Sequence, residues 1–112
     1  MTFFRSCLAI LAAGFAGVSL ACDYPPLVSV PDGASATIDE MVAAQQTVRS
    51  YMDAMDAYLN CVNDELQAAG DDAPEEFKAI MVGRHNAAVE EMEMVAASFN
   101  DQIAAFRSAN PE

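Results

Sequence analysis

Few residues of this chain could do chemistry: three cysteines, one histidine and seven methionines among 112 residues. Cys22 and Cys61 are the two cysteines that remain if residues 1–21 are removed as an export signal. An oxidising compartment would let these two thiols form a disulfide bond. Because their spacing differs from the Cys-x-x-Cys of redox enzymes, we expect this bond to be structural.

The methionines and the histidine suggest a different chemistry, which is binding of copper(I), because soft metals favour thioether and imidazole ligands. Met81 and His85 lie four residues apart, and Met55 and Met92 lie near them on the expected helical hairpin. Most of the methionines nevertheless occupy core positions, where methionine is a flexible filler. We therefore predict no cofactor and keep a periplasmic copper-binding module as the alternative, with these ligands: Met55, Met81, His85 and Met92.

Catalytic patterns are missing from the sequence. His85 has no nucleophile in a recognisable motif beside it, so we expect it to be partly buried and bonded to Tyr58 or to an acid. The acids around Gly70 do not have the offsets of a calcium loop. They fit helix capping and a favourable charge at a helix start better. We predict a protein that is not an enzyme.

Residues 1–21 have the pattern of a signal peptide, with one positive charge before an apolar run over residues 8–20. Ser19 and Ala21 place small residues where signal peptidase reads, which predicts cleavage after Ala21, a periplasmic location and no membrane span after cleavage. Two alternatives stay open: an uncleaved anchor, and acylation of Cys22 as in a lipoprotein. Acylation usually has an aliphatic residue where Ser19 stands, so this position argues against it.

The composition is strongly acidic, with 17 acidic and 5 basic residues and a net charge of −12 at pH 7. Such a surface repels nucleic acid and anionic lipid, so neither is an expected partner. It favours solubility and basic partners. The length is that of one small domain after the signal peptide.

Residues 22–36 are expected to form an extended strap. This segment carries three prolines and ends in a Pro-Asp-Gly turn. Thr37 and Glu40 then fit a capping box, in which each side chain satisfies a backbone amide of the other residue. A helix is therefore predicted over residues 38–69.

Residues 37–112 are expected to form a helical hairpin. Gly70 suits the end of the first helix, and Pro74 suits the first turn of a second helix over about residues 73–108. Mostly apolar residues recur at spacings of three and four and form a seam of more than four heptads in the first helix, from Ile38 through Gln45, Met52 and Leu59 to Ala69. The facing seam of the second helix includes Met81, His85 and Phe106. A short loop makes the helices antiparallel neighbours. The predicted fold class is all-α: an antiparallel two-helix coiled-coil hairpin with an extended N-terminal strap tied by a disulfide.

The strap is expected to lie along a second face of the first helix, on the side toward which the second helix turns Ala87 and Met94. Its apolar side chains would pack on the tyrosines of that face: Tyr24, Leu27 and Val30 on Tyr51 and Tyr58. The helix rises roughly 36 Å between residues 37 and 61, and the strap can reach roughly 46 Å as polyproline II. A Cys22–Cys61 bond would close a loop of about 40 residues and contribute roughly 4 kcal/mol on the chain-entropy model.

Another apolar stripe follows the opposite flank of the second helix at seven-residue intervals: Val82, Val89, Ala96 and Ile103, with Val42 facing them. The rest of the facing side is polar, with Arg49, Asp56 and Asn63. This stripe is either an ordinary half-exposed flank or a surface for a protein partner or a homodimer.

Short motifs are spread along the chain: Cys22-Asp23-Tyr24-Pro25, Pro31-Asp32-Gly33, Ala36-Thr37, Glu40-Met41-Val42, Tyr58-Leu59-Asn60-Cys61, His85-Asn86-Ala87-Ala88, Val95-Ala96 and Phe99-Asn100. In combination they resemble a family of short, uncharacterised exported proteins of proteobacteria. The resemblance covers nearly the whole chain after the signal peptide, although the region between the helices is shorter here. Since that family has no assigned activity, the resemblance implies no catalytic residue. The sequence favours a non-enzymatic periplasmic hairpin that acts through a surface, as an interaction or envelope accessory protein.

Overall fold

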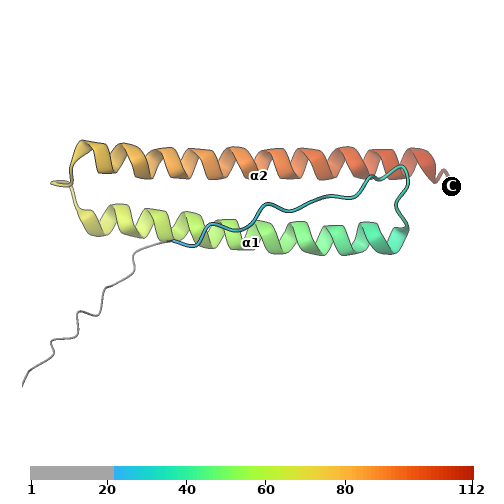
Figure 1. Ribbon diagram of the computed structural model, residues 1–112, viewed down its shortest axis with the longest axis horizontal. Helices are drawn as coiled ribbons and strands as arrows, with labels where there is room; N and C mark the ends of the chain where they lie inside the picture. Colours follow the sequence, from blue (N-terminus) through green and yellow to red (C-terminus); the bar gives the residue numbers. More distant parts are fainter. Residues whose placement is uncertain (1–21) are drawn as a thin grey trace, which may run out of the picture.

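Two long antiparallel helices form the molecule, and an extended strap runs along the groove between them (Figure 1). Helix α1 covers Ile38–Ala69 and helix α2 covers Glu75–Ala109. The computed structural model describes residues 22–112, and the predicted signal peptide, residues 1–21, lies outside the described residues. Within residues 22–112 there is no strand, and the predicted disulfide-strapped helical hairpin is confirmed.

The predicted capping box starts α1. The Thr37 hydroxyl accepts the Glu40 backbone N–H at 3.2 Å, and the Glu40 carboxylate accepts the Thr37 backbone N–H at 2.8 Å. These bonds satisfy two of the amides that a helix start leaves without partners. At its other end α1 stops at Gly70, whose φ of 75° lies in the left-handed region that suits glycine.

Helix α2 begins at Glu75, slightly later than the predicted start near residue 73, and ends at Ala109. Pro74 is the N-cap, with extended φ and ψ angles of −56° and 139°, and it makes no side-chain cap bond. Because the residue before a proline disfavours helical angles, Ala73 stays outside the helix. The connecting loop is closed by Lys78, whose ammonium donates to the Asp71 carbonyl at 2.8 Å.

The core is centred on the side of the hairpin that the strap covers. The buried residues of α1 follow one continuous spacing of three and four: Met41, Ala44, Val48, Tyr51, Met55, Tyr58 and Val62. Those of α2 are Met81, Ala88, Val95 and Phe99. In α1 this set combines residues from two predicted faces. Met41, Val48, Met55 and Val62 belong to the predicted seam, and Ala44, Tyr51 and Tyr58 belong to the face predicted to contact the strap. Helix α1 therefore packs against α2 and the strap together.

The other half of the predicted seam is exposed to different degrees. Gln45 and His85 are exposed, and Ile38 is 61% exposed although it stands beside Phe106. Their placement in the seam was wrong because the strap covers only one side of the groove between the helices. On the other side, Met52 and Leu59 are only half-buried.

The strap turns a regular set of side chains inward. Cys22, Pro25, Val28 and Pro31 are all half-buried, at intervals of three residues. This is the repeat of a polyproline II segment. The predicted packing of Leu27 was wrong, because Leu27 is 72% exposed and Val28 packs against the core instead.

Neither helix in the described part of the chain has the combination of length and hydropathy that crossing a membrane requires.

Candidate functional site

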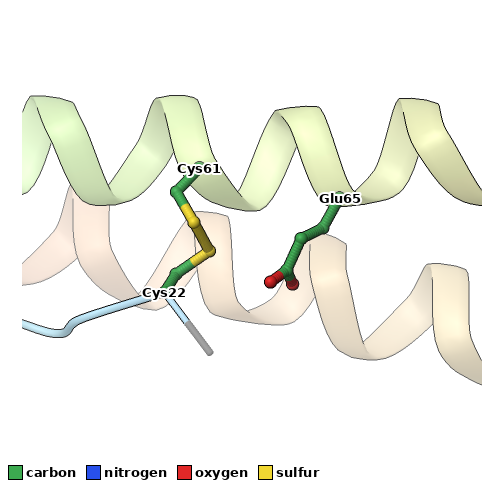
Figure 2. Close-up of side chains that lie close together, drawn as sticks. All are labelled: Cys22, Cys61 and Glu65. Carbon is green, nitrogen blue, oxygen red and sulfur yellow. A yellow bond between two sulfur atoms is a disulfide. The ribbon is translucent and has the colours of Figure 1, made fainter. Parts of the chain in front are cut away.

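The disulfide fixes the N-terminal end of the strap. Cys22 and Cys61 are bonded, and their Cα atoms are 5.7 Å apart, within the usual range for a disulfide. Figure 2 shows the bond joining the strap to α1, about two turns before the C-terminal end of that helix. The sequence prediction of this pairing is confirmed. Both sulfurs are half-buried and consumed by the bond, so neither acts as a nucleophile in this form.

Glu65 lies one turn beyond Cys61 on the same face of α1, and its carboxylate lies on the same side of the helix as the disulfide (Figure 2). One carboxylate oxygen and the sulfurs of Cys22 and Cys61 all lie within 4.8 Å of one another. The thiolate, rather than the disulfide sulfur, is the metal ligand of cysteine. This trio is therefore no metal site while the disulfide is intact. The Glu65 Oε1 atom is buried and has no hydrogen-bond partner among residues 22–112.

A second fastening joins the strap, α1 and α2 at one carboxylate. The hydroxyls of Tyr24, from the strap, and Tyr51, from α1, both donate to Glu91 of α2. The Tyr51 bond measures 2.8 Å. The Tyr24 ring also meets Tyr58 edge-on, with ring centroids 4.8 Å apart and an interplanar angle of 75°. We call Tyr24, Tyr51, Tyr58 and Glu91 the tyrosine clasp.

Burial and the Glu91 carboxylate hold the hydroxyls of Tyr24 and Tyr51 in the protonated form. Burial, the hydrogen bond to Glu91 and the charge of that carboxylate raise the pKa of Tyr24 to about 12. The same causes raise the pKa of Tyr51. A hydroxyl held protonated donates a hydrogen bond well but is a poor base or nucleophile near neutral pH. The tyrosine clasp is therefore built for attachment rather than for catalysis.

Replacing Glu91 tests this attachment. Glu91→Ala is expected to lower the free energy of unfolding by about 2 kcal/mol, because the buried Tyr51 hydroxyl loses its acceptor. Glu90→Ala, at the exposed neighbouring position, is expected to change it by less than about 0.5 kcal/mol. Urea denaturation followed by circular dichroism measures both values. Equal effects of the two variants would contradict a special role for Glu91.

A third fastening holds the turn at the other end of the strap. The backbone N–H of Gly33 donates to the Gln102 side-chain oxygen of α2 at 2.8 Å. The turn itself is closed by the Ala36 N–H, which donates to the Asp32 carbonyl at 2.9 Å. Gly33 is buried against α2. The strap is thus attached at both ends and at its Tyr24 clasp.

Two attachment residues were missed by the sequence analysis: Glu91 and Gln102. Their signal in the sequence is weak, because each is one polar residue among many on an acidic helical surface. For Glu91 a signal existed, since it follows Ala87 and precedes Met94 on the side of α2 expected to face the strap. A carboxylate on that side needs a donor, and Tyr24 and Tyr51 were already expected there.

The four copper-ligand candidates do not converge on one cavity. Met55 and Met81 are fully buried in the core, and Met92 packs against that core. His85, by contrast, is exposed, which contradicts the expectation of a partly buried histidine bonded to Tyr58 or an acid. The Met81 sulfur accepts a hydrogen bond from the Arg84 guanidinium at 3.9 Å, so a cation already occupies its outer side.

The predicted partner surface lies on the side of the hairpin away from the strap. Val42 and Val82 are 46% and 50% exposed, and the rest of the stripe is half-buried: Val89, Ala96 and Ile103. At one end of this face an open cleft of about 290 Å³ lies between Ile38 and Val42 of α1 and Ile103 and Phe106 of α2. We call this side the open face.

These features define a class of protein, a helical hairpin with a disulfide-anchored N-terminal strap. The chain matches no protein-family model, and comparison with the curated proteins and with the solved structures gives no match either. The resemblance to short exported proteins of proteobacteria stays a prediction.

Proposed function

We propose that this protein is an exported, non-enzymatic adaptor of the periplasm, and that it binds a basic amphipathic helix of a partner protein on its open face. The observation that carries this proposal is that the strap covers only one of the two sides of the hairpin. The strap and its three fastenings shield one side of the groove between the helices. The open face has no such cover within the described residues.

The shape of the open face favours a helical partner. Val82, Val89, Ala96 and Ile103 recur every seven residues along α2. A partner helix that packs along α2 meets such a stripe once in every two turns, which is how helices recognise one another in coiled coils. The half-buried Met52 and Leu59 of α1 would form the floor of the same contact.

The charge of the chain favours a basic partner over a second copy. The net charge is −12, and exposed acids such as Asp53, Asp56 and Glu93 lie beside the apolar stripe. A homodimer through this face would bring two strongly acidic surfaces together, whereas a basic helix would be attracted and oriented.

The export part of the proposal rests on two features of the N-terminal end of the strap, the disulfide and the predicted cleavage site beside it. A disulfide persists in the periplasm and outside the cell, and is rare in the cytosol. Cys22 immediately follows the predicted cleavage site, so the mature chain would begin at the residue that is anchored.

Site-specific photo-crosslinking in living cells tests the adaptor function. A benzophenone amino acid placed at Val89, on the open face, is expected to yield one discrete adduct. The same probe at Ala97, exposed on α2 beside the stripe residue Ala96, serves as the matched control and should yield none. Ala96→Glu, combined with the Val89 probe, is expected to lower the yield of the adduct at least tenfold. The same substitution should leave the melting curve measured by circular dichroism unchanged.

The mass and identity of the adduct decide between the occupants. An adduct with a protein that carries a basic amphipathic helix, sensitive to Ala96→Glu, supports the proposal. An adduct of twice the chain mass identifies a homodimer and overturns the choice of partner. Equal labelling from both probe positions, or no labelling from either, overturns the open face as a binding surface.

A further inference from the structure

The Glu65 carboxylate lies in a position that calls for a hydrogen-bond donor, and residues 22–112 supply none to its Oε1 atom, which is buried. An ionised carboxylate out of contact with water is costly unless it is paired or hydrogen-bonded. The site next to the disulfide therefore suits a cationic donor.

The amino nitrogen of Cys22 is the group best placed to be that donor. The Cys22 sulfur lies within 4.8 Å of a Glu65 carboxylate oxygen. Three covalent bonds separate a cysteine sulfur from its own amino nitrogen, a span of about 3 to 4 Å. The disulfide to Cys61 holds Cys22 over α1, and Figure 2 shows the Glu65 carboxylate on the same side of that helix. A free amino group on Cys22 could therefore turn toward the carboxylate.

The chemical state of that nitrogen depends on processing. While Ala21 precedes Cys22, the nitrogen is an amide with no charge and a single hydrogen. Cleavage between the two residues would turn it into an ammonium group with three donors and a positive charge. An ammonium and a carboxylate in a half-buried site form a charge-assisted hydrogen bond, which is stronger than one between neutral groups.

We propose that Glu65 is the binding site for the free amino terminus of the mature protein, the α-ammonium of Cys22 produced by cleavage after Ala21. This inference rests on the export part of the proposed function and adds a residue that recognises its product. Cys22 is then held twice, by its sulfur to Cys61 and by its nitrogen to Glu65. Acylation as in a lipoprotein would consume both of these groups, so the site is incompatible with a lipid anchor at Cys22.

Amine labelling of the exported protein tests the pairing. The full chain is expressed with its signal, and the protein is purified from the periplasm and weighed by mass spectrometry. Lys78 is the only lysine, so a chain that begins at Cys22 has two amines and Lys78 serves as the internal reference. A carboxylate partner raises the pKa of an α-amino group above its ordinary value of about 7.7 to 8.0, and each unit slows acylation at pH 7 about tenfold.

Glu65→Gln is the informative variant, since it keeps the size of the side chain and removes its charge. In this variant we expect the Cys22 amine to react with an acetyl ester about tenfold faster than in the unaltered protein, relative to Lys78. The variant should also melt about 5 °C lower, the shift expected for one interaction in a domain of this size. Asp64→Asn, at the exposed neighbouring position, is the matched control and should change neither quantity.

The outcomes separate the two proposals. In one outcome the chain begins at Cys22 and its amine is acylated equally fast in the unaltered protein and in Glu65→Gln. This result overturns the pairing with Glu65 and leaves export intact. A mass that includes residues before Cys22, or a diacylglyceryl group, overturns both the cleavage after Ala21 and the pairing. A Cys22 amine that is slow in the unaltered protein and in Asp64→Asn, but fast in Glu65→Gln, supports the inference.

Discussion

Cys61→Ser is expected to lower the melting temperature of the protein by about 15 °C or more. The disulfide joins residues separated by 39 positions, and closing a loop of this size contributes about 4 kcal/mol on the chain-entropy model. In a domain of fewer than 100 residues, each kcal/mol shifts the melting temperature by about 4 to 8 °C. Thermal unfolding followed by circular dichroism at 222 nm measures the change.

Two comparisons separate the bond from the side chain. The unaltered protein with a phosphine reductant should melt near the Cys61→Ser variant, because both lose the same cross-link. Asn60→Ser, at the exposed neighbouring position of α1, should melt within about 2 °C of the unaltered protein. A Cys61→Ser variant that melts within a few degrees of the unaltered protein would mean that the tyrosine clasp and the Gly33 turn hold the strap without help from the disulfide.

The disulfide and the tyrosine clasp act on the same segment, so their effects should not add. Once Cys61→Ser releases residue 22, the Tyr24 hydroxyl also loses the restraint that keeps it at Glu91. Glu91→Ala should therefore cost less in the Cys61→Ser background than alone, as is usual for residues that share one structural element. The strap is in this sense a single cooperative unit with several attachments.

The parts of the fold that sequence predicted well are those with local causes. Both boundaries of α1 follow from short-range chemistry, the Thr37–Glu40 capping box and the positive φ of Gly70. The hairpin follows from two long apolar repeats and a short loop. The Cys22–Cys61 pairing follows from the small number of cysteines and from lengths that match along the strap and the helix.

The parts that sequence missed depend on which side of the hairpin the strap covers. The apolar repeats of α1 allow two neighbouring faces, one with Gln45, Met52 and Leu59 and another with Ala44, Tyr51 and Tyr58. Only the docked strap decides that the second face is buried. The same decision exposes His85, which a two-helix seam alone would have buried. The predicted packing of Leu27 was wrong for a related reason. The disulfide turns Cys22 inward, and every third residue after it also turns inward, so Val28 packs against the core in place of Leu27.

The polar attachments were the hardest to predict. Glu91 and Gln102 contact strap residues that lie 67 and 69 positions away in the chain. No local propensity distinguishes them from the other polar residues of α2. Their partners, a tyrosine hydroxyl and a backbone N–H, are placed by the three-dimensional path of the strap, which the sequence alone leaves open in detail.

Gly33→Ala is the second substitution with a large expected effect, a loss of about 3 kcal/mol. A Cβ atom added to Gly33 would lie 1.9 Å from the backbone oxygen of Gln102 and 2.8 Å from its carbonyl carbon. Neither atom can move without breaking the helical ladder of α2, so the turn itself must lift away. Lifting it also stretches the 2.8 Å hydrogen bond from the Gly33 N–H to the Gln102 side chain.

Gly83→Ala supplies the matched control, because both substitutions add the same single methyl group. A Cβ at Gly83 would meet nothing within 4 Å, and alanine is favoured over glycine inside a helix by about 1 kcal/mol. Gly83→Ala should therefore raise the melting temperature by a few degrees, whereas Gly33→Ala should lower it by about 12 °C or more. The two shifts differ in sign because only one glycine lies against backbone. Equal melting temperatures for the two variants would show that the strap turn does not rest on α2 in solution, and that the hairpin is covered only from Cys22 to the tyrosine clasp.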